Sequence, residues 1–261
     1  MQSSFPIGTA LITGASSGIG AALAIALARP DAILHLSGRH EDRLARIAHA
    51  CATRGATVHT RVLDVRDAAA MADWIAGAGR LDLVIANAGI APGNHGIAGE
   101  TSEQTRAVIA TNLDGALNTV LPALQVMRRQ PAALDGRRGR IAVIASIAAF
   151  IPVPGAAAYC ASKAAIDTWV VAHAPAAARD GVQLASVCPG WIRTPMIAGI
   201  RHALPGVMEP DRAAQLILRG VLAGRTRVVF PRWLAMLARF GALLPPALLG
   251  RLAAGKTGGS A

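Results

Sequence analysis

The chain has 261 residues, 53% of them hydrophobic and 16% charged, so it can bury a large core, and this composition excludes intrinsic disorder. Aromatic residues make up only 3%, and the core must therefore be built mainly from Ala, Leu, Ile and Val. The net charge of +11 is compatible with a polyanion partner such as nucleic acid or anionic lipid, or with an arginine-rich solvated surface. We favour the solvated surface, because the basic residues are spread along the chain, and their one dense run (Arg128, Arg129, Arg137, Arg138 and Arg140) is expected in a loop and has no interleaved aromatic residues.

Short apolar runs alternate with longer alanine-rich stretches along most of the chain. The runs lack polar–apolar alternation, which is typical of strands covered on both faces. Strands that alternate with helices predict an α/β fold, a single-domain doubly wound parallel sheet of about seven strands. The predicted strands span residues 9–13, 32–37, 58–63, 81–86, 140–146, 183–187 and 227–230, and the predicted helices span residues 18–29, 41–53, 67–77, 102–128 and 157–179.

A glycine-rich turn follows the first predicted strand. Its glycines permit a tight bend that lets backbone N–H groups approach a pyrophosphate, and the start of the next helix adds partial positive charge. The spacing is neither GxGxxG nor that of a P-loop, which disfavours an NTPase. The turn predicts a phosphate site that includes Gly14, Ser16, Ser17, Gly18, Ile19 and Gly20.

The end of the second predicted strand indicates which dinucleotide binds. An acidic residue there would bind a ribose 2′-hydroxyl and favour NAD, but the sequence has Gly38 and Arg39 instead. Gly38 leaves space and the Arg39 guanidinium suits a 2′-phosphate, so we expect NADP(H) in preference to NAD(H). The alternative is that Arg39 is a solvated residue at a helix start. After the third strand, Asp64 and Val65 stand where Asp64 can accept from an adenine amino group or cap a turn.

Capping residues mark the starts of two predicted helices. Asp67 is the expected N-cap of the third helix, and Thr101 and Gln104 have the spacing of a capping box at the start of the fourth. The fourth is predicted as one continuous helix over residues 102–128.

The only tyrosine of the chain, Tyr159, precedes Lys163 by four residues on the predicted helix 157–179, so both side chains lie on one face. A phenol titrates near pH ~10 and needs roughly 4 kcal/mol of help to exchange protons near neutrality. An ammonium ~4 Å away at an effective dielectric constant of ~20 supplies about that much. Ser146 closes the fifth strand and can reach the same crevice. These three residues predict a general acid/base site.

The tail departs from this strand–helix pattern. Residues 231–241 are apolar at helical spacing, with Arg232 and Arg239 on a neighbouring edge. Prolines 245 and 246 end this helix, and we expect a second short helix over residues 247–254 and a frayed end over 255–261. The favoured interpretation is a helix packed over the substrate cleft or against another subunit, and a membrane-surface helix is the alternative. We divide the chain into a dinucleotide-binding and catalytic domain, residues 1–230, and a C-terminal helical extension, residues 231–261.

In this order and spacing, the motifs resemble the short-chain dehydrogenase/reductase family over roughly residues 7–230. The further matching pieces are Asn87-Ala88-Gly89, Asn112 between Thr111 and Leu113, and Pro189-Gly190-x-x-x-Thr194. The resemblance implies a Rossmann-fold oxidoreductase that uses NAD(P) to interconvert a carbonyl and an alcohol. It also implies a homodimer or homotetramer paired through the helices 102–128 and 157–179, although the tail departs from the family pattern.

The resemblance assigns a role to each site residue. Tyr159 would be the general acid/base, and Ser146 would orient the substrate. Lys163 would lower the pKa of the tyrosine and hold the nicotinamide ribose, and Asn112 would hold a water of the proton relay. Cofactor contacts would also come from Gly14, Ser16, Ser17, Gly18, Ile19, Gly20, Arg39, Asp64, Val65, Asn87, Ala88, Gly89, Pro189, Gly190, Ile192 and Thr194.

The substrate is expected to be a small and mostly apolar carbonyl or alcohol. The candidate walls are residues 90–99, 147–158 and 191–208, which contain Ile147, Phe150, Ile151, Val153, Trp191, Met196 and Ile200. Two alternatives stay open. One is a non-catalytic NADP(H) sensor, which need not keep all four catalytic residues. The other is a methyltransferase, which has no use for Tyr159 and Lys163.

Three scattered cysteines, Cys51, Cys160 and Cys188, fit neither a disulfide framework nor a zinc site. They indicate a reducing compartment, and we expect a cytoplasmic protein without a bound metal. Cys160 and Cys188 lie near the predicted site and are interpreted as small core residues. A signal peptide at residues 1–8 and a membrane-spanning helix are not expected.

Overall fold

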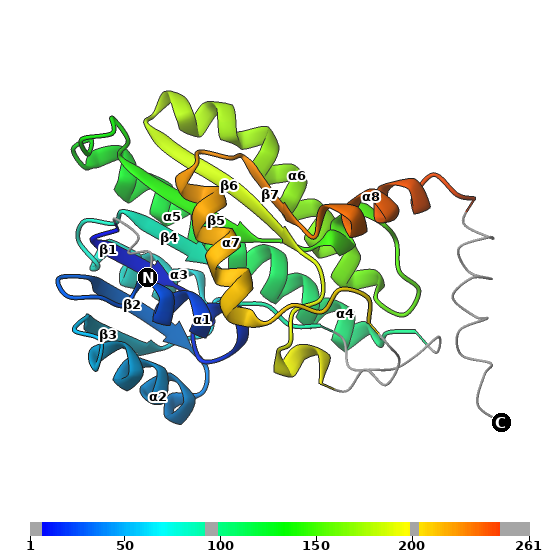
Figure 1. The fold of residues 1–261 in the computed structure, drawn as a ribbon, viewed down its shortest axis with the longest axis horizontal. Helices are drawn as coiled ribbons and strands as arrows, with labels where there is room; N and C mark the ends of the chain where they lie inside the picture. Colours follow the sequence, from blue (N-terminus) through cyan, green and yellow to red (C-terminus); the bar gives the residue numbers. More distant parts are fainter. Residues whose placement is uncertain (1–6, 92–98, 199–203, 246–261) are drawn as a thin grey trace.

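A computed structural model describes residues 7–91, 99–198 and 204–245, and it contains one seven-stranded parallel sheet with the strand order β3-β2-β1-β4-β5-β6-β7 (Figure 1). The predicted fold class is confirmed. The strands are β1 (Thr9–Ile12), β2 (Ile33–Gly38), β3 (Thr57–Val62), β4 (Leu83–Ala86), β5 (Gly139–Ile144), β6 (Val182–Pro189) and β7 (Arg227–Phe230). The helices are α1 (Gly18–Leu27), α2 (Glu41–Ala52), α3 (Ala68–Ala76), α4 (Ser102–Ile109), α5 (Gly115–Arg129), α6 (Ala157–Arg179), α7 (Pro210–Leu222) and α8 (Arg232–Gly241).

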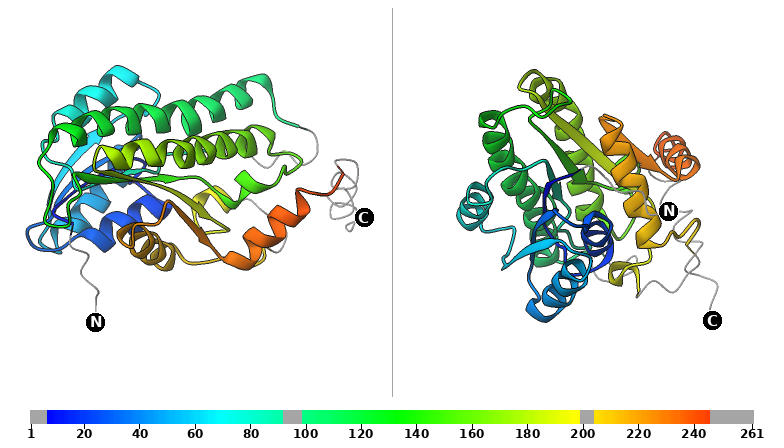
Figure 2. Two further views of the ribbon diagram at one scale, coloured as in Figure 1. Left: turned by 90° about the horizontal axis from the view of Figure 1, so that it is seen from above. Right: turned by 60° about the vertical axis from the view of Figure 1, so that its left-hand side comes forward.

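The sheet is the middle of three layers, with α1, α2 and α7 on one face and α3, α5 and α6 on the other (Figure 2). Successive residues of a central strand enter different halves of the core. In β1, Ala10 and Ile12 pack with the first set of helices and Leu11 packs with the second. Because both faces are covered, both sets of side chains must be apolar, which explains the unbroken apolar runs in the sequence.

The third strand differs from the prediction of burial on both faces. β3 lies at the edge of the sheet, and four of its residues from His59 to Val62 are exposed. An edge strand has one neighbour, here β2, and only Val58 packs partly against the core. The apolar residues at 58 and 62 suggested a buried strand, but the strand order determines burial here.

Two helices also differ from the prediction. The helix predicted over residues 102–128 contains a π-helical turn, Ala110–Asp114, between α4 and α5, and the backbone keeps helical angles at both ends of this turn. Helix α7 was not predicted, although Pro210 occupies its first turn and Ala213, Ile217 and Val221 recur at helical spacing on its buried face. The expected caps are confirmed: Asp67 accepts from the N–H of Ala70, and Thr101 and Gln104 form the capping box.

The arginine run at residues 128–140 was interpreted as part of a loop. Arg128 and Arg129 instead end α5, and Arg140 lies in β5. Arg128 pairs with Asp180 at 2.7 Å, and Arg140 pairs with Asp135. Basic side chains in the last turn of α5 also offset the negative end of its helix dipole.

The strand order reverses between β1 and β4, which lie side by side at the centre of the sheet. The connections from these two strands leave toward opposite faces, so a crevice opens beyond their carboxyl ends. The glycine turn follows β1 and the Asn87-Ala88-Gly89 segment follows β4, so both predicted motifs lie at this crevice.

Candidate active site

The glycine turn makes a cradle that side chains would fill. Gly14 and Gly18 have φ values of +65° and +56°, which favour glycine. A Cβ atom on Gly14 would lie 2.8 Å from the Cα of Ala88, and one on Gly20 would overlap the carbonyl oxygen of Gly14. The backbone of the turn therefore passes directly beside the segment that follows β4.

Helix α1 begins at this cradle without a side-chain cap. Ser17 is its N-cap, and its hydroxyl makes no capping hydrogen bond. The N–H groups of the first helical turn have no partner within the helix, so they are suited to an anion. Gly38 leaves room for Ser16, because a Cβ at residue 38 would lie 3.1 Å from the Ser16 hydroxyl oxygen. The γ-methyl of Thr194 covers the turn, 2.9 Å from the position of a Cβ on Gly18.

Thr13 and Asn87 tie the ends of β1 and β4 together. The side-chain amide of Asn87 donates to the carbonyl oxygens of Thr13 at 2.9 Å and Gly14 at 3.2 Å. The Thr13 hydroxyl accepts from the backbone N–H groups of Asn87 at 3.0 Å and Ala88 at 3.2 Å. These bonds hold the cradle in shape and join the ends of the two central strands at the point where the strand order reverses.

The three residues expected to bind the adenosine end of the cofactor differ in exposure and in their contacts. Arg39 is exposed after β2. Asp64 caps the turn that follows β3, because its carboxylate accepts from the backbone N–H of Arg66 at 2.9 Å and pairs with the Arg66 guanidinium at 2.7 Å. That hydrogen-bonded pair lowers the pKa of Asp64, and the Arg39 charge contributes in the same direction. Val65 is buried against Gly115, so its side chain belongs to the core.

Tyr159 and Lys163 lie on one face of α6, with the Lys163 ammonium 5.8 Å from the centre of the Tyr159 ring. Lys163 is buried, and its Nζ donates to the carbonyl oxygen of Ile144, the last residue of β5, at 2.8 Å. Burial lowers the pKa of Lys163 to about 8. Ser146 is two residues beyond β5, and its hydroxyl accepts from the N–H of Ala148 at 3.1 Å. The three predicted residues therefore meet at the carboxyl end of β5.

The pKa of Tyr159 lies above its ordinary value, opposite to the direction expected from Lys163. Burial of the phenol raises the pKa, and a hydrogen bond with the Ser146 side chain acts in the other direction. The Lys163 ammonium donates to the Ile144 carbonyl and lies 5.8 Å from the centre of the Tyr159 ring. In this arrangement Tyr159 is a protonated donor at neutral pH.

Asn112 lies in the π-helical turn, and this turn places its side chain between two elements. Its Oδ1 accepts from the N–H of Ile90 at 2.8 Å, and its Nδ2 donates to the carbonyl of Ile90 at 2.9 Å and to the Ser162 hydroxyl at 3.2 Å. A Cβ on Gly89 would lie 3.1 Å from Asn112 Oδ1 and 3.5 Å from Lys163 Nζ. Asn112, Gly89 and Lys163 are therefore neighbours. A π-turn at such a position is typical of functional sites.

The segment after β6 completes the site. Gly190 approaches Pro231 and Leu234 so closely that a Cβ would lie 3.0 and 3.1 Å from them. Ile192 is buried in the core and bridges to Met208. The structure thus brings Thr194 to the glycine turn and places the side chain of Ile192 in the core.

Two acidic residues that were not singled out from the sequence hold α6 in place. Glu100 accepts from the N–H of Ala158 in the first turn of α6, at 3.0 Å for one oxygen. Asp167, almost fully buried, accepts from the Ser186 hydroxyl at 2.6 Å and pairs with Arg227 at 2.7 Å. Asp167 extends the four-residue spacing of Tyr159 and Lys163, and this spacing was the available signal. A buried carboxylate requires such partners.

Some of the side chains predicted to line the substrate pocket belong to the hydrophobic core instead. Ile147, Phe150 and Ile151 pack against α8, and Val153 and Met196 are exposed. Ile200 and the segments 92–98 and 199–203 lie outside the described residues, as do the predicted second tail helix and the expected frayed end.

Cys160 and Cys188 are buried with free thiols, and burial raises the pKa of both, to about 12 for Cys188. They behave as core residues with low reactivity.

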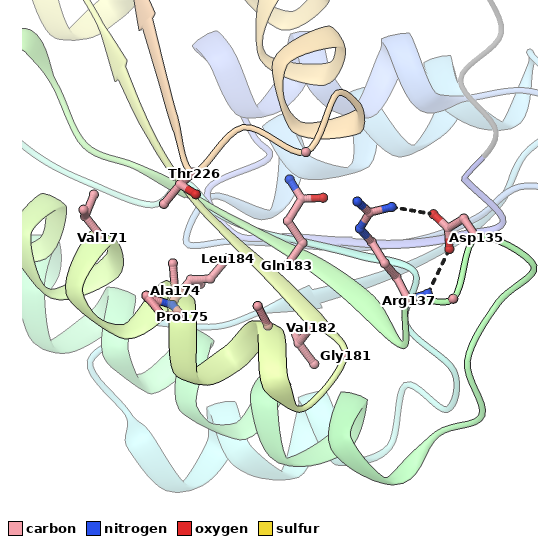
Figure 3. A pocket seen from close by; sticks show the side chains of 13 residues that line it. Asp135, Arg137, Val171, Ala174, Pro175, Gly181, Val182, Gln183, Leu184 and Thr226 are labelled. Carbon is pink, nitrogen blue, oxygen red and sulfur yellow. Dashed lines mark hydrogen bonds and ion pairs between the residues drawn. The ribbon is translucent and has the colours of Figure 1, made fainter.

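A hollow of about 500 Å³ lies at the other end of the sheet, beside the start of β6 and the second half of α6 (Figure 3). Its charged residues, Asp135 and Arg137, pair with each other at 3.3 Å. Ser146 and Thr194 follow the carboxyl ends of β5 and β6, whereas this hollow lies at the amino end of β6. It is therefore separate from the crevice.

Comparisons with known proteins agree with this geometry. A family model for short chain dehydrogenase matches residues 8–205. An uncharacterized oxidoreductase of Myxococcus xanthus is 34% identical over 241 residues, which cover 91% of this chain and 92% of the relative. A solved short-chain dehydrogenase from Sphingobium yanoikuyae in complex with NADPH has a TM-score of 0.77 at 28% identity, with 97% of this chain and 94% of that chain covered. A short chain dehydrogenase from Mycobacterium paratuberculosis bound to NAD shares the fold, with a TM-score of 0.74 at 24% identity and coverage of 87% and 97%.

Proposed function

This chain belongs to the short-chain dehydrogenase/reductase family of oxidoreductases, and on that premise we propose that it uses NADP(H) to interconvert a carbonyl and an alcohol, with Tyr159 as the general acid/base. The observation that carries the proposal is the meeting of Ser146, Tyr159 and Lys163 at the same sheet edge as the glycine cradle. A sensor would need the cradle but not a phenol and an ammonium beside it.

The chain's own residues fit a dinucleotide. The bare glycine backbone and the uncapped start of α1 suit a diphosphate, which Gly14, Ser16, Ser17, Gly18, Ile19 and Gly20 would hold. Thr194 and the backbone of Pro189, Gly190 and Ile192 would contact the nicotinamide end, and Asn87, Ala88 and Gly89 would line the crevice. When bound, the cofactor supplies the hydride that is exchanged with the substrate carbon.

Tyr159 donates the proton to the carbonyl oxygen during reduction, which suits a phenol whose pKa is raised by burial. Ser146 orients the substrate oxygen beside the phenol. Lys163 is positioned by the Ile144 carbonyl to bind the nicotinamide ribose, and with its pKa of about 8 it is mainly charged at neutral pH. Asn112, fixed by Ile90 and Ser162, continues the proton relay on the side of Gly89.

The preference for NADP(H) rests on Arg39. Its side chain is exposed directly after β2, where residues 38–40 are Gly, Arg and His and none is acidic. The carboxylate of Asp64 lies close enough to be influenced by the Arg39 charge, but it already pairs with Arg66. Arg39 is therefore available for a 2′-phosphate.

Replacement of Arg39 by Ala is expected to raise the Kd of NADPH by about 10- to 100-fold, the typical loss for a charge-assisted hydrogen bond, and to leave that of NADH nearly unchanged. Titration of both nucleotides against the change in nicotinamide fluorescence measures this. Arg66→Ala, which removes a neighbouring arginine engaged with Asp64, is the matched control. Equal losses for the two nucleotides in Arg39→Ala contradict the 2′-phosphate assignment.

The expected substrate is a lipophilic ketone or alcohol, and a panel of such compounds tests the function. Loss of NADPH absorbance with a ketone, followed by identification of the alcohol, supports the oxidoreductase. Tight NADPH binding without turnover of any ketone or alcohol favours a sensor, and binding of S-adenosylmethionine instead of NADPH favours a methyltransferase.

We place the enzyme in the cytoplasm, where its buried free thiols stay reduced. We expect it to be a homodimer or homotetramer that pairs through α4, α5 and α6.

A further inference from the structure

Helix α8 presents apolar side chains on two opposite sides. Its inner side carries Ala235 and Ala238, which are buried against Ile147 and its neighbours beyond β5. This side accounts for the attachment of α8 to the domain. A helix at the surface of a water-soluble fold normally has polar residues on the opposite side.

The outer side of α8 is apolar and exposed. Exposure rises along the helix from 48% at Trp233 to 64% at Phe240 and 79% at Leu243, just past its end. Figures 1 and 2 show why: α8 projects away from the carboxyl end of the sheet, so its far end has fewer neighbours. The outer side consists of Trp233, Met236, Leu237, Phe240, Leu243 and Leu244. A contiguous exposed apolar surface of this kind marks an interaction site.

The part of the chain that carries this surface has charged residues of one sign. Asp211 is the last acidic residue of the chain, and residues 212–261 contain eight Lys and Arg residues and no Asp or Glu. Arg232 and Arg239 are exposed and seven residues apart, so they lie on the same side of α8 beside the outer apolar residues. The Arg239 guanidinium lies 4.5 Å from the centre of the Phe150 ring, which holds it at that edge.

This combination fits an anionic lipid surface. We propose that α8 docks the protein on an anionic bilayer, with its outer side at the boundary between headgroups and acyl chains and its arginines among the lipid phosphates. Trp and Phe favour that boundary, and the net charge of +11 adds long-range attraction. Within the described ranges, no helix is both long and apolar enough to cross a bilayer, so the contact is peripheral. The proposal does not depend on the catalytic assignment.

A second copy of the chain fits this surface less well. A two-fold pairing of α8 with α8 places Arg232 and Arg239 of one copy close to those of the other. No acidic side chain after Asp211 offsets this repulsion. An anionic bilayer instead provides counter-charges and apolar contacts together.

Cosedimentation of the full chain with lipid vesicles tests the proposal. We expect binding to vesicles of phosphatidylcholine and phosphatidylglycerol to be at least about tenfold stronger than to phosphatidylcholine alone, and to weaken with salt. The triple variant Trp233→Gln/Leu237→Gln/Phe240→Gln should lose at least about tenfold in binding to the anionic vesicles. Its thermal unfolding midpoint should stay close to that of the wild type, because the replaced side chains are 48% to 64% exposed.

Leu134→Gln is the matched control, since Leu134 is fully exposed in the loop before β5 at the other end of the sheet, and it should bind like the wild type. Failure of the wild type to bind anionic vesicles overturns the proposal, as does equal binding by the triple variant. A third outcome also overturns the proposal: the wild type does not bind vesicles but self-associates in light scattering, and the triple variant does not self-associate. That result assigns the surface to a second copy of the chain.

Discussion

Tyr159→Phe is expected to lower kcat for ketone reduction by about 10³-fold, within the usual range for loss of a general acid. The substitution removes only the hydroxyl, so the ring keeps its packing on α6 and its place beside Lys163. NADPH affinity should change little, because the glycine cradle and Arg39 are intact. Steady-state rates and NADPH titrations on the same samples separate the two effects.

The pH dependence gives this prediction a second measurement. Burial raises the pKa of Tyr159, so the phenol stays protonated as pH rises through neutrality and remains a donor for reduction. Oxidation of the alcohol needs the deprotonated phenol, so its rate should rise with pH into the alkaline range, and Tyr159→Phe should abolish that rise. Unchanged reduction in the variant refutes the assigned role of Tyr159.

Asp167→Asn is expected to lower the free energy of unfolding by about 3 kcal/mol. The Asp167 carboxylate is 5% exposed, and it accepts a hydrogen bond from Ser186 and pairs with Arg227 at the same time. An amide cannot accept on both of its ends, so the substitution leaves one of the two donors without its partner and removes the charge opposite Arg227, whose side chain is 34% exposed. Urea denaturation monitored by circular dichroism measures the loss.

Asp180→Asn is the matched control for this experiment. Asp180 pairs with Arg128 at the same distance of 2.7 Å, but both side chains are 42% exposed. An exposed pair contributes only about 0–1 kcal/mol, so this variant should unfold nearly like the wild type. If the two variants lose equal stability, burial does not determine the contribution of the Asp167 pair.

The Asp167 ion pair also affects the position of the site residues, because α6 carries Tyr159, Lys163 and Asp167 at four-residue intervals. Asp167 fastens the helix to β6 and β7, and Glu100 fastens its first turn. Both residues lie outside the motifs, so the motifs identify the reacting groups but not the contacts that hold them.

Several features could be predicted from the sequence because they depend on neighbours in the chain. Burial on both faces makes the central strands apolar throughout, so these strands could be located from the sequence, and the predicted range 58–63 also overlaps the exposed edge strand β3. The caps at Asp67 and Thr101 act within one helical turn. The spacing of Tyr159 and Lys163 alone puts them on one face of α6, and the glycines of the turn at 14 and 18 indicate its positive φ angles.

Other features depended on partners far away in the chain. Strand order made β3 an exposed edge. Asn112 accepts from the Ile90 N–H and donates to Ser162, and these bonds accompany the π-turn within the predicted fourth helix. The direction of the Tyr159 pKa shift depended on the burial of the phenol. Apolar spacing predicted a helix at 231–241, but only the packing of Ala235 and Ala238 shows which side is left exposed. Local propensity and spacing thus determined the helices, the strands and the reacting groups. The tertiary structure decided burial, pKa and exposure, because each of these depends on neighbours in space that lie far away in the sequence.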